Sequence, residues 1–240
     1  MLFVEGILSM KITYIHHSAF LVETASACLL FDYFEGALPE IPKDKPLYVI
    51  ASHCHGDHFS DVVFELAKIY DKIRYILSSD IWMKRVPEEL KGLTVSISPY
   101  EEWSDNILQV ETFKSTDEGV AFWCKVDGTE LYHAGDLNHW YWEGEDEQWN
   151  KDMTKAYRAE LEKMRGRKAD VAFLPLDPRL EQWFYLGIDD FMKAVDTDVI
   201  VPMHFWGQFD VAQKLKALDC SEGYRDRIVE ILEKGQTFTV

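Results

Sequence analysis

One six-residue segment, His53-Cys54-His55-Gly56-Asp57-His58, holds the densest set of potential metal ligands in the chain. It follows the apolar run LYVIAS (47–52), so a buried strand would present it on a loop at the rim of a sheet. Two histidines separated by one residue can point the same way from an extended backbone and chelate one ion. The aspartate and the last histidine, after the glycine, can then reach a second ion. Imidazole and carboxylate ligands suit Zn²⁺, Fe²⁺ or Mn²⁺, and we favour a metal site over a solvated polar loop.

Two further potential ligands also stand directly after an apolar strand. Asp136 follows the run ELYHA (130–134), and His204 follows DVIVPM (198–203). Open α/β sheets place their ligands at the carboxyl ends of strands. Taken alone, an aspartate in a turn is usually structural, and a single histidine usually belongs to the surface or the core. Beside the first segment, both become candidate metal ligands.

Three motifs together, HCHGDH (53–58), HAGD (133–136) and PMH (202–204), resemble those of the metallo-β-lactamase-fold hydrolases. The signature of that family is HxHxDH followed by separate His, Asp and His ligands. The resemblance spans nearly the whole chain. It implies an α/β (α+β) fold, a four-layer αβ/βα sandwich, with a dinuclear metal site between the rims of the two sheets. It also implies a metal-dependent hydrolase that uses a metal-activated hydroxide.

The family's ligand positions, carried over onto this sequence, divide into a first site, a second site and a bridge. The first metal would be held by His53 and His55, the second by Asp57, His58 and His204, with Asp136 as the bridge. Two divalent metal ions are therefore expected, Zn²⁺ as the first choice and Mn²⁺ or Fe²⁺ as alternatives. Asp57, or Asp136 at the bridge, would orient the hydroxide and carry its proton, so these two are the candidate catalytic residues.

One ligand of the family has no counterpart here. The region where a histidine is expected has the sequence FKSTDEGV (113–120), which places Ser115 or a neighbour at that position. Asp117 is the nearest strong ligand and could supply the missing donor. Alternatively, it only opens a turn at Asp-Glu-Gly. An oxygen-rich first site would shift the preference from Zn²⁺ toward Mn²⁺ or Fe²⁺, or leave that site weak or empty.

Four other residues close to the motifs carry expectations. Asp32, at the end of a strand, either accepts an N–H from a ligand imidazole or belongs to an ordinary turn. His17 resembles the histidine found before Ser or Thr in related chains and is a candidate to line the site. His133 is expected to be packed within a strand. Cys54, between two ligands, should point away from the metal.

Aromatic residues follow two of the candidate ligands. Residues 140–142 (WYW) come after the HAGD motif, and Phe205 and Trp206 come after PMH. They could be core residues or the walls of a pocket. Arg179 could pair with a substrate anion, although a surface role is the simpler hypothesis.

The elements that must position these side chains are strands in the first half and alternating strands and helices later. Short runs rich in β-branched and aromatic residues predict strands at 11–15, 19–23, 27–31, 47–52, 74–77, 93–97, 107–113, 120–126, 130–134, 171–176 and 198–203. Helical patterns occupy 59–70, 152–165, 188–195, 209–218 and 222–234. This order predicts a pair of sheets covered by helices, in a single domain over residues 1–240. Because Met10 opens the first strand run, residues 1–9 are interpreted as an N-terminal extension, and the choice between Met1 and Met10 as the start is left open.

Composition narrows the range of functions. The 240 residues include 25 Lys+Arg against 42 Asp+Glu, a formal net charge of −17, and 47% are apolar. The apolar fraction excludes a disordered chain, and the acidic balance argues against non-specific binding to nucleic acid or anionic membranes. Four cysteines without a CxxC pair predict reduced thiols and a cytoplasmic protein. No apolar run approaches the roughly 18 to 20 residues of a membrane span.

The expected function is hydrolysis of a small-molecule ester, lactone, thioester or phosphodiester, among which the sequence does not choose. Three alternatives remain. A nuclease or phosphodiesterase of the same fold would need a Lys/Arg-rich surface, and no such arm occurs in the sequence. A non-hydrolytic iron oxygenase of the same fold would differ in its bound metal. A non-enzymatic scaffold is disfavoured because all four HxHxDH residues are present. The sequence leaves the oligomeric state open.

Overall fold

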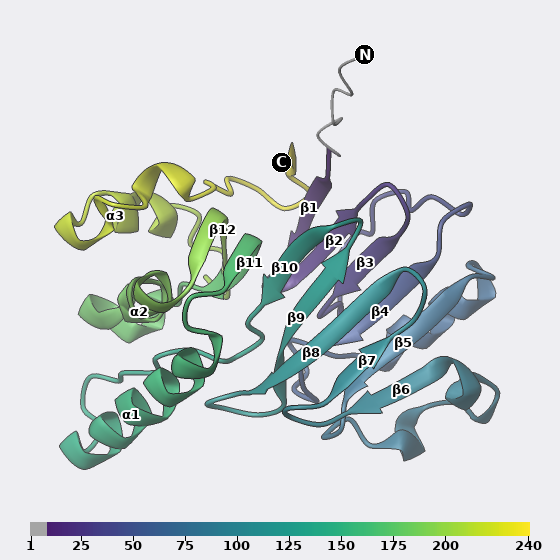
Figure 1. Cartoon of the computed structure of the whole chain (residues 1–240), viewed down its shortest axis with the longest axis horizontal. Coiled ribbons are helices and arrows are strands. Elements are labelled where there is room, and N and C mark those ends of the chain that lie inside the picture. The colour runs from purple at the N-terminus through teal and green to yellow at the C-terminus, as the bar shows by residue number, and fades with distance from the viewer. Residues whose placement is uncertain (1–8) are drawn as a thin grey trace.

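Strands from the first 97 residues, together with one strand near the C-terminus, form a mixed β-sheet with the order β13-β1-β2-β3-β4-β5-β6 (Figure 1). The computed structural model describes residues 9–240. The strands of this first sheet are β1 (Lys11–His16), β2 (Ala19–Glu23), β3 (Cys28–Phe31), β4 (Leu47–Ala51), β5 (Ile73–Ser78), β6 (Thr94–Ile97) and β13 (Thr237–Thr239). Strands β1 to β3 pair antiparallel, whereas β3 to β6 pair in parallel. The carboxyl ends of β3, β4 and β5 therefore lie at one rim.

The second sheet has the order β12-β11-β10-β9-β8-β7. Its strands are β7 (Glu102–Ser104), β8 (Leu108–Lys114), β9 (Val120–Val126), β10 (Thr129–His133), β11 (Lys168–Pro175) and β12 (Asp196–Met203). Strands β7 to β10 form an antiparallel meander, and β10, β11 and β12 are parallel. Asp127 and Gly128 join β9 to β10 with positive φ at both residues, the backbone that a two-residue hairpin favours.

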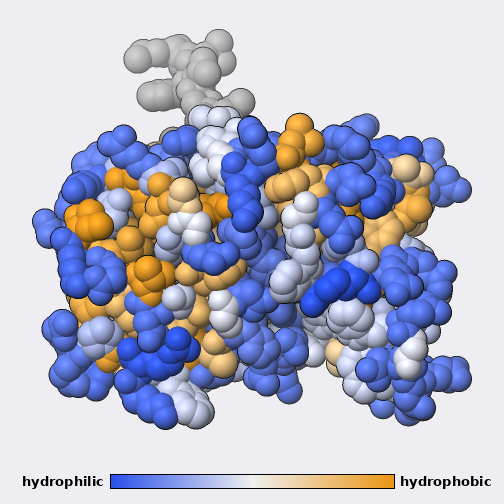
Figure 2. Space-filling view, turned by 180° about the vertical axis from the view of Figure 1, so that it is seen from behind, coloured by the Kyte–Doolittle hydropathy of each residue, from blue (hydrophilic) through white to orange (hydrophobic). Residues whose placement is uncertain are grey.

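Helices and 3-10 turns cover the outer faces of the two sheets. The α-helices are α1 (Glu147–Met164), α2 (Leu186–Ala194) and α3 (Val211–Lys216). The 3-10 segments are η1 (Asp61–Lys68), η2 (Met83–Arg85), η3 (Glu88–Leu93), η4 (Pro178–Trp183), η5 (Asp219–Ser221) and η6 (Arg225–Arg227). Helix α2 packs on β11 and β12, and α1 packs on α2 (Figure 1). Seen from behind, hydrophilic residues cover most of the surface, and apolar residues show between them mainly in one half (Figure 2).

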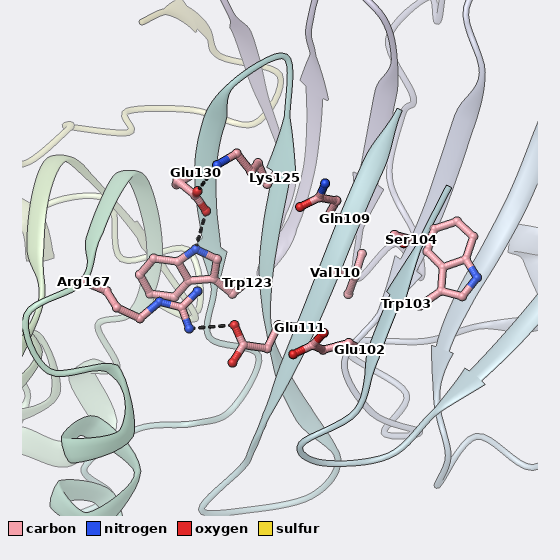
Figure 3. A pocket seen from close by; sticks show the side chains of 10 residues that line it. All are labelled: Glu102, Trp103, Ser104, Gln109, Val110, Glu111, Trp123, Lys125, Glu130 and Arg167. Carbon is pink, nitrogen blue, oxygen red and sulfur yellow. Dashed lines mark hydrogen bonds and ion pairs between the residues drawn. The ribbon is translucent and has the colours of Figure 1, made fainter. Parts of the chain in front are cut away.

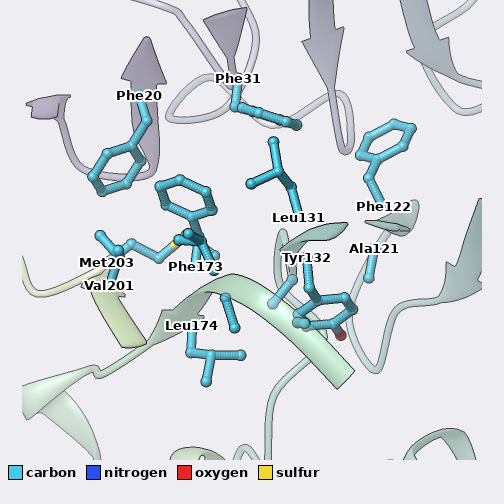
Figure 4. Close-up of a cluster of buried hydrophobic side chains, with 14 of the residues drawn as sticks. Phe20, Phe31, Ala121, Phe122, Leu131, Tyr132, Phe173, Leu174, Val201 and Met203 are labelled. Carbon is cyan, nitrogen blue, oxygen red and sulfur yellow. The ribbon is translucent and has the colours of Figure 1, made fainter. Parts of the chain in front are cut away.

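Two apolar cores separate the layers. The larger core lies between the sheets, where Phe20 and Phe31 of the first sheet meet Phe173 and Met203 of the second (Figure 4). The ring centroids of Phe20 and Phe173 are 4.8 Å apart. A second core joins the other face of the first sheet to η1 and its neighbours. The order helix, sheet, sheet, helix confirms the four-layer αβ/βα sandwich.

Some predicted elements differ from those observed. The helix predicted at 222–234 is wrong: the chain forms one short 3-10 turn there, η6, and Ile228 forms a β-bridge with Ile200. The pattern at 59–70 forms the 3-10 segment η1 instead of an α-helix, and β7 and β13 were not expected. Long-range pairing with another strand outweighs local helix propensity in the first case, because it satisfies the backbone and buries Ile228.

Within residues 9–240, no helix is long and apolar enough to cross a membrane. The interpretation of residues 1–9 as an extension falls almost wholly on residues 1–8, which lie outside the described residues. The single-domain assignment stays a prediction.

Candidate metal centre

The structure brings all seven predicted ligands together at one rim of the two sheets. Each lies on a loop that follows a strand: the HCHGDH segment follows β4, and the other three residues, Asp117, Asp136 and His204, follow β8, β10 and β12. Strand ends fix the start of each loop, so residues far apart in sequence converge. They form two groups, and within each group one ligand atom per residue lies within 4.8 Å of every other.

The first group consists of His53, His55, Asp117 and Asp136. The Nε2 atom of His53 is 3.6 Å from Oδ2 of Asp136, and Nδ1 of His55 is 3.7 Å from Oδ2 of Asp117. The side chain of His53 is fully buried, whereas those of His55 and Asp117 are each 47% exposed. The first group is therefore open to solvent on one side. Asp117 stays a predicted ligand: its carboxylate lies beside His55, and its backbone N–H donates to Oγ of Ser115 at 3.1 Å, as a turn residue also would.

The second group consists of His17, Asp57, His58 and His204. The Nε2 atom of His17 is 3.5 Å from Oδ2 of Asp57, and the rings of His17 and His204 are 4.0 Å apart. All three histidines are buried. The sequence suggested His17 only as a residue lining the site, and its side chain instead stands among the potential ligands.

Asp136 lies between the two groups. Its Oδ2 faces His53, while its Oδ1 is 3.2 Å from Nε2 of His58 and 3.4 Å from Nε2 of His204. One carboxylate oxygen thus points toward each group. This is the geometry that a bridging ligand requires.

Several buried polar atoms at this centre have no hydrogen-bond partner within the described part of the chain. They are Nε2 of His17, Nε2 of His53, Nε2 of His58 and Oδ1 of Asp136. Two of these atoms, Nε2 of His58 and Oδ1 of Asp136, face each other at 3.2 Å, whereas Nε2 of His17 and of His53 have no such close contact apart from carboxylate oxygens at 3.5 and 3.6 Å. An unsatisfied buried polar atom costs on the order of 1–3 kcal/mol, so a group of them in one place calls for a ligand. Imidazole nitrogens and a carboxylate oxygen are donors that divalent transition metals accept. The residues present therefore fit divalent cations.

Hydrogen bonds behind the histidines hold their rings in place. Asp32 is buried and accepts hydrogen bonds from the backbone N–H and the hydroxyl of Ser52, both at 2.7 Å. Its Oδ2 lies 2.7 Å from Nδ1 of His58, and Oγ of Ser52 lies 3.0 Å from Nδ1 of His53. With each Nδ1 engaged behind the ring, each Nε2 is left facing the centre. Of the two expectations for Asp32, contact with a ligand imidazole is the one observed.

Asp177 holds His204 in the same way, and the sequence analysis missed it. Its Oδ2 lies 2.9 Å from Nδ1 of His204 and also accepts the indole N–H of Trp206. A signal was available, because Asp177 directly follows the strand at 171–176, as Asp136 follows its own strand. For the loop that follows this strand, the sequence prediction named only Arg179.

Two glycines let the ligand loops approach one another. A Cβ atom at Gly119 would lie 2.0 Å from the carbonyl oxygen of Ser52, and one at Gly135 would lie 2.6 Å from the Cβ of Ser52. Both glycines have positive φ, which disfavours other residues. The backbone at His17 and His204 is also left-handed, with φ of 52° and 62°. Such strain is held by the surrounding structure and is typical of functional sites.

The charges at this centre are strongly coupled. Burial lowers the pKa of His53 and of His17 to about 4. Burial acts on His204 in the same direction, but Asp136 and Asp177 outweigh it and raise the pKa of His204 to about 9. For His58, Asp136 and Asp32 likewise outweigh burial and raise its pKa well above the usual value.

The carboxylates show the complementary effect. Burial would raise the pKa of Asp136, but His58 and His204 hold it well below its usual value. Burial and the nearby Asp136 raise the pKa of Asp117. The carboxylates thus need positive charge beside them, and protonated imidazoles or divalent cations can supply it. Metal binding at His58 and His204 would displace protons.

Two of the remaining expectations concern side chains outside the centre. His133 is packed as expected: its ring stacks on Phe31 at 4.8 Å, and its Nε2 lies 3.1 Å from the carbonyl oxygen of Ser18. Cys54 belongs to neither ligand group and packs against the core on the far side of the first sheet. Its orientation agrees with the expected alternation along the HCH segment.

A cavity of about 320 Å³ opens beside both groups. Its walls include Trp140, Trp142 and Trp206, which confirms the pocket role for these three, whereas Phe205 is buried in the core. Helix α1 adds Trp149, which the sequence did not suggest. A small cavity that combines indole walls with polar groups, at a cluster of potential metal ligands, is typical of a site for a small molecule.

A larger cavity, of about 640 Å³, lies on the outer face of the second sheet (Figure 3). Four of its charged groups form two pairs: Arg167 contacts Glu111 at 2.6 Å, and Glu130 accepts from Lys125 and also from the indole N–H of Trp123. Neither potential ligand group borders it. The chemistry therefore belongs to the smaller cavity.

Comparison with known proteins agrees with this geometry. Residues 11–151 match the family model of the β-lactamase superfamily domain. A UPF0173 metal-dependent hydrolase of Pyrococcus abyssi is 30% identical over 81% of this chain and 84% of its own length. A metallo hydrolase from Ignicoccus hospitalis has a similar fold, with a TM-score of 0.62 and 18% identity over 97% of this chain and 98% of that one. A diiron β-hydroxylase from Streptomyces venezuelae shares the fold at a TM-score of 0.60 and 12% identity, covering 97% of this chain and 54% of that one.

Proposed function

The chain belongs to the β-lactamase superfamily and is a metal-dependent hydrolase, and from this premise we propose that it cleaves a small-molecule ester, lactone, thioester or phosphodiester at a centre of two divalent metal ions. The observation that carries the dinuclear proposal is Asp136, whose two oxygens face two separate groups of ligands. Proteins with two adjacent metal ions commonly share a carboxylate in this way.

The proposed ligand sets follow the two groups. The first metal would be held by His53, His55, Asp117 and one oxygen of Asp136. The second would be held by His17, Asp57, His58, His204 and the other oxygen of Asp136. Zn²⁺ is the first choice for nitrogen-rich sites, and the carboxylate of Asp117 makes Mn²⁺ or Fe²⁺ suitable at the first site.

Divalent ions held by these two groups would lower the pKa of bound water to about 7 and would polarise the oxygen of the scissile group. The chain's own residues supply the rest. The histidine that faces Asp57, His17, helps to hold its carboxylate ionised with a depressed pKa, so Asp57 can orient the nucleophile by accepting a hydrogen bond from it. Asp136, also ionised, would assist from the bridge.

A second candidate function is an iron-dependent oxygenase. It is favoured by one observation, the oxygen donor Asp117 in the first group, because carboxylate-rich sites suit iron. The two candidates differ in the metal that the protein retains. A nuclease remains less favoured, because the cavity is small and Arg179 is the one Lys or Arg that lines it among the described residues.

The experiment that tests the proposal is elemental analysis of protein purified without chelators. We expect one to two transition-metal ions per chain, because the buried ligand atoms otherwise lack partners. Protein reconstituted with Zn²⁺, Mn²⁺ or Fe²⁺ would then be screened against one substrate of each class. A chain that binds no metal, even after reconstitution, would refute the proposed centre.

Replacing Asp117 should separate the two sites. Asp117→Asn removes a charged donor from the first group only, so we expect the first metal to weaken by at least the 10–100-fold that indirect changes near a metal cost, while the second is retained. Metal stoichiometry before and after dialysis against a weak chelator measures this. Full occupancy of both sites in the variant would show that Asp117 only opens a turn.

A further inference from the structure

The cavity beside the ligand groups contains an arginine in an aromatic setting. Arg179 is the one Lys or Arg among its described lining residues. Its guanidinium carbon lies 4.4 Å from the ring centroid of Trp206 and 5.6 Å from that of Trp142. A guanidinium at such distances from indole rings is attracted to them, because cation and ring attract each other. The cation therefore has a fixed place in the wall.

Asp177 fixes the orientation of this guanidinium. The Nε atom of Arg179 donates to Asp177 at 2.9 Å, and Nη2 also contacts this carboxylate. In the part of the chain that the structure describes, Nη1 makes no hydrogen bond. Asp177 is fully buried, and its carboxylate also contacts Nδ1 of His204 and accepts a hydrogen bond from the indole N–H of Trp206. Arg179 thus keeps one donor edge free for an anion, and little side-chain entropy would be lost when it binds.

The aromatic walls offer flat apolar surface next to this donor edge. The rings of Trp140 and Trp142 stack at 6.2 Å with an angle of 8° between their planes. Trp149 and Trp206 are 40% and 47% exposed, although both are large apolar side chains. Rigid indole faces that remain exposed at a cavity are suited to cover a planar apolar group.

We propose that this cavity takes substrates that combine a planar apolar group with a carboxylate or phosphate, and that Arg179 pairs with the anion while the tryptophans cover the apolar group. The proposal rests on the function proposed above and names the class of its substrate. The volume of about 320 Å³ limits the ligand to a small molecule.

The chain contains a matched control for Arg179. Arg158 pairs with the buried Asp190, its Nε lying 3.0 Å from Oδ2, and the same oxygen is 3.0 Å from Nδ1 of His139. In both places one buried aspartate contacts a histidine on one side and an arginine on the other, as Asp177 does with His204 and Arg179. Arg158, however, does not line the cavity of the metal centre.

The test is ligand binding to metal-loaded protein, followed by the quenching of tryptophan fluorescence. The probes are 2-naphthoate, 2-naphthylphosphonate and the uncharged 2-naphthol. We expect Arg179→Met to weaken at least one of the two anions by roughly tenfold or more, since a charge-assisted pair is lost, and 2-naphthol by less than about twofold. Arg179→Lys, which keeps the charge but not the planar fork, should fall between Arg179→Met and the wild type. Arg158→Met should bind all three probes as the wild type does.

The pattern of losses decides the outcome. A loss of affinity that is larger for the carboxylate or for the phosphonate than for 2-naphthol supports the proposal. The anion with the larger loss identifies the group that the substrate carries. An equal loss for 2-naphthol and the anions, an unchanged anion affinity, or no binding of any probe by the wild type overturns it. Metal content measured on the same samples separates this result from a failure of the proposed function, which would show as protein that takes up no metal.

Discussion

Asp136→Asn is expected to release both metal ions and to reduce kcat/KM by at least about a thousandfold. The asparagine keeps the shape of the side chain but loses the charge that faces His53, His58 and His204. Changing a residue that only supports a ligand typically lowers metal affinity 10–100-fold, and the loss of a direct ligand should lower it further. Both metals would lose a ligand in this variant, so the two effects on activity multiply. Elemental analysis after gel filtration would measure the metal, and hydrolysis of the best substrate from the screen would measure the rate.

The matched control for this variant is Asp190→Asn. Asp190 is as buried as Asp136 and also contacts a histidine and an arginine, but it belongs to neither ligand group. We expect the Asp190→Asn protein to be less stable than the wild type and to retain its metal. If Asp136→Asn retained both ions, the bridge would be refuted, and each group would have to hold its ion independently.

Gly119→Ala should be the most destabilising single methyl addition at this centre. Its Cβ would lie 2.0 Å from the backbone oxygen of Ser52 and 2.6 Å from the Cβ of His53, at a φ of +68°. Neither neighbour is the flexible end of a side chain, so the loops that follow β4 and β8 must separate. We expect a loss of at least about 4 kcal/mol in the free energy of unfolding, at the upper end of what single substitutions cost. Urea denaturation would measure it.

Gly128→Ala is the control for this prediction. Gly128 also has positive φ, +82°, but a Cβ there would meet nothing within 4 Å. The free energy of unfolding of this variant should fall only by the backbone strain of an alanine at positive φ, about 1–2 kcal/mol. Equal losses in the two variants would mean that the close approach of Gly119 to Ser52 does not contribute to stability, and that only its φ matters.

The sequence predicted those parts of the fold and the centre that depend on local pattern. The HCHGDH segment, Asp136 and His204 were found because each directly follows an apolar strand, and strand ends meet at a rim. Asp177 follows a strand in the same way, but the sequence prediction for this loop named only Arg179, two residues later.

The place of His17 could not be predicted from alternation along the strand. The pairing of β1 with β2 shifts register between Tyr14 and His16, so counting residues gives the wrong face beyond that point. His17 then turns inward on a left-handed backbone, with φ of 52°. The segment at 222–234 failed for a different reason. Its backbone pairs with Ile200, a residue distant in sequence, and no local pattern reports that contact.

The unequal exposure of the two ligand groups sets the order in which ions would arrive and leave. In the first group, the side chains of His55 and Asp117 are each 47% exposed. In the second group, the three histidines are buried, and Asp57, at 34%, is the member that reaches solvent. An ion at the enclosed group would exchange slowly, and one at the open group would equilibrate with the surrounding metal pool. When metal becomes scarce, the population would shift first to a form with one ion, and its activity would follow supply through the open group alone.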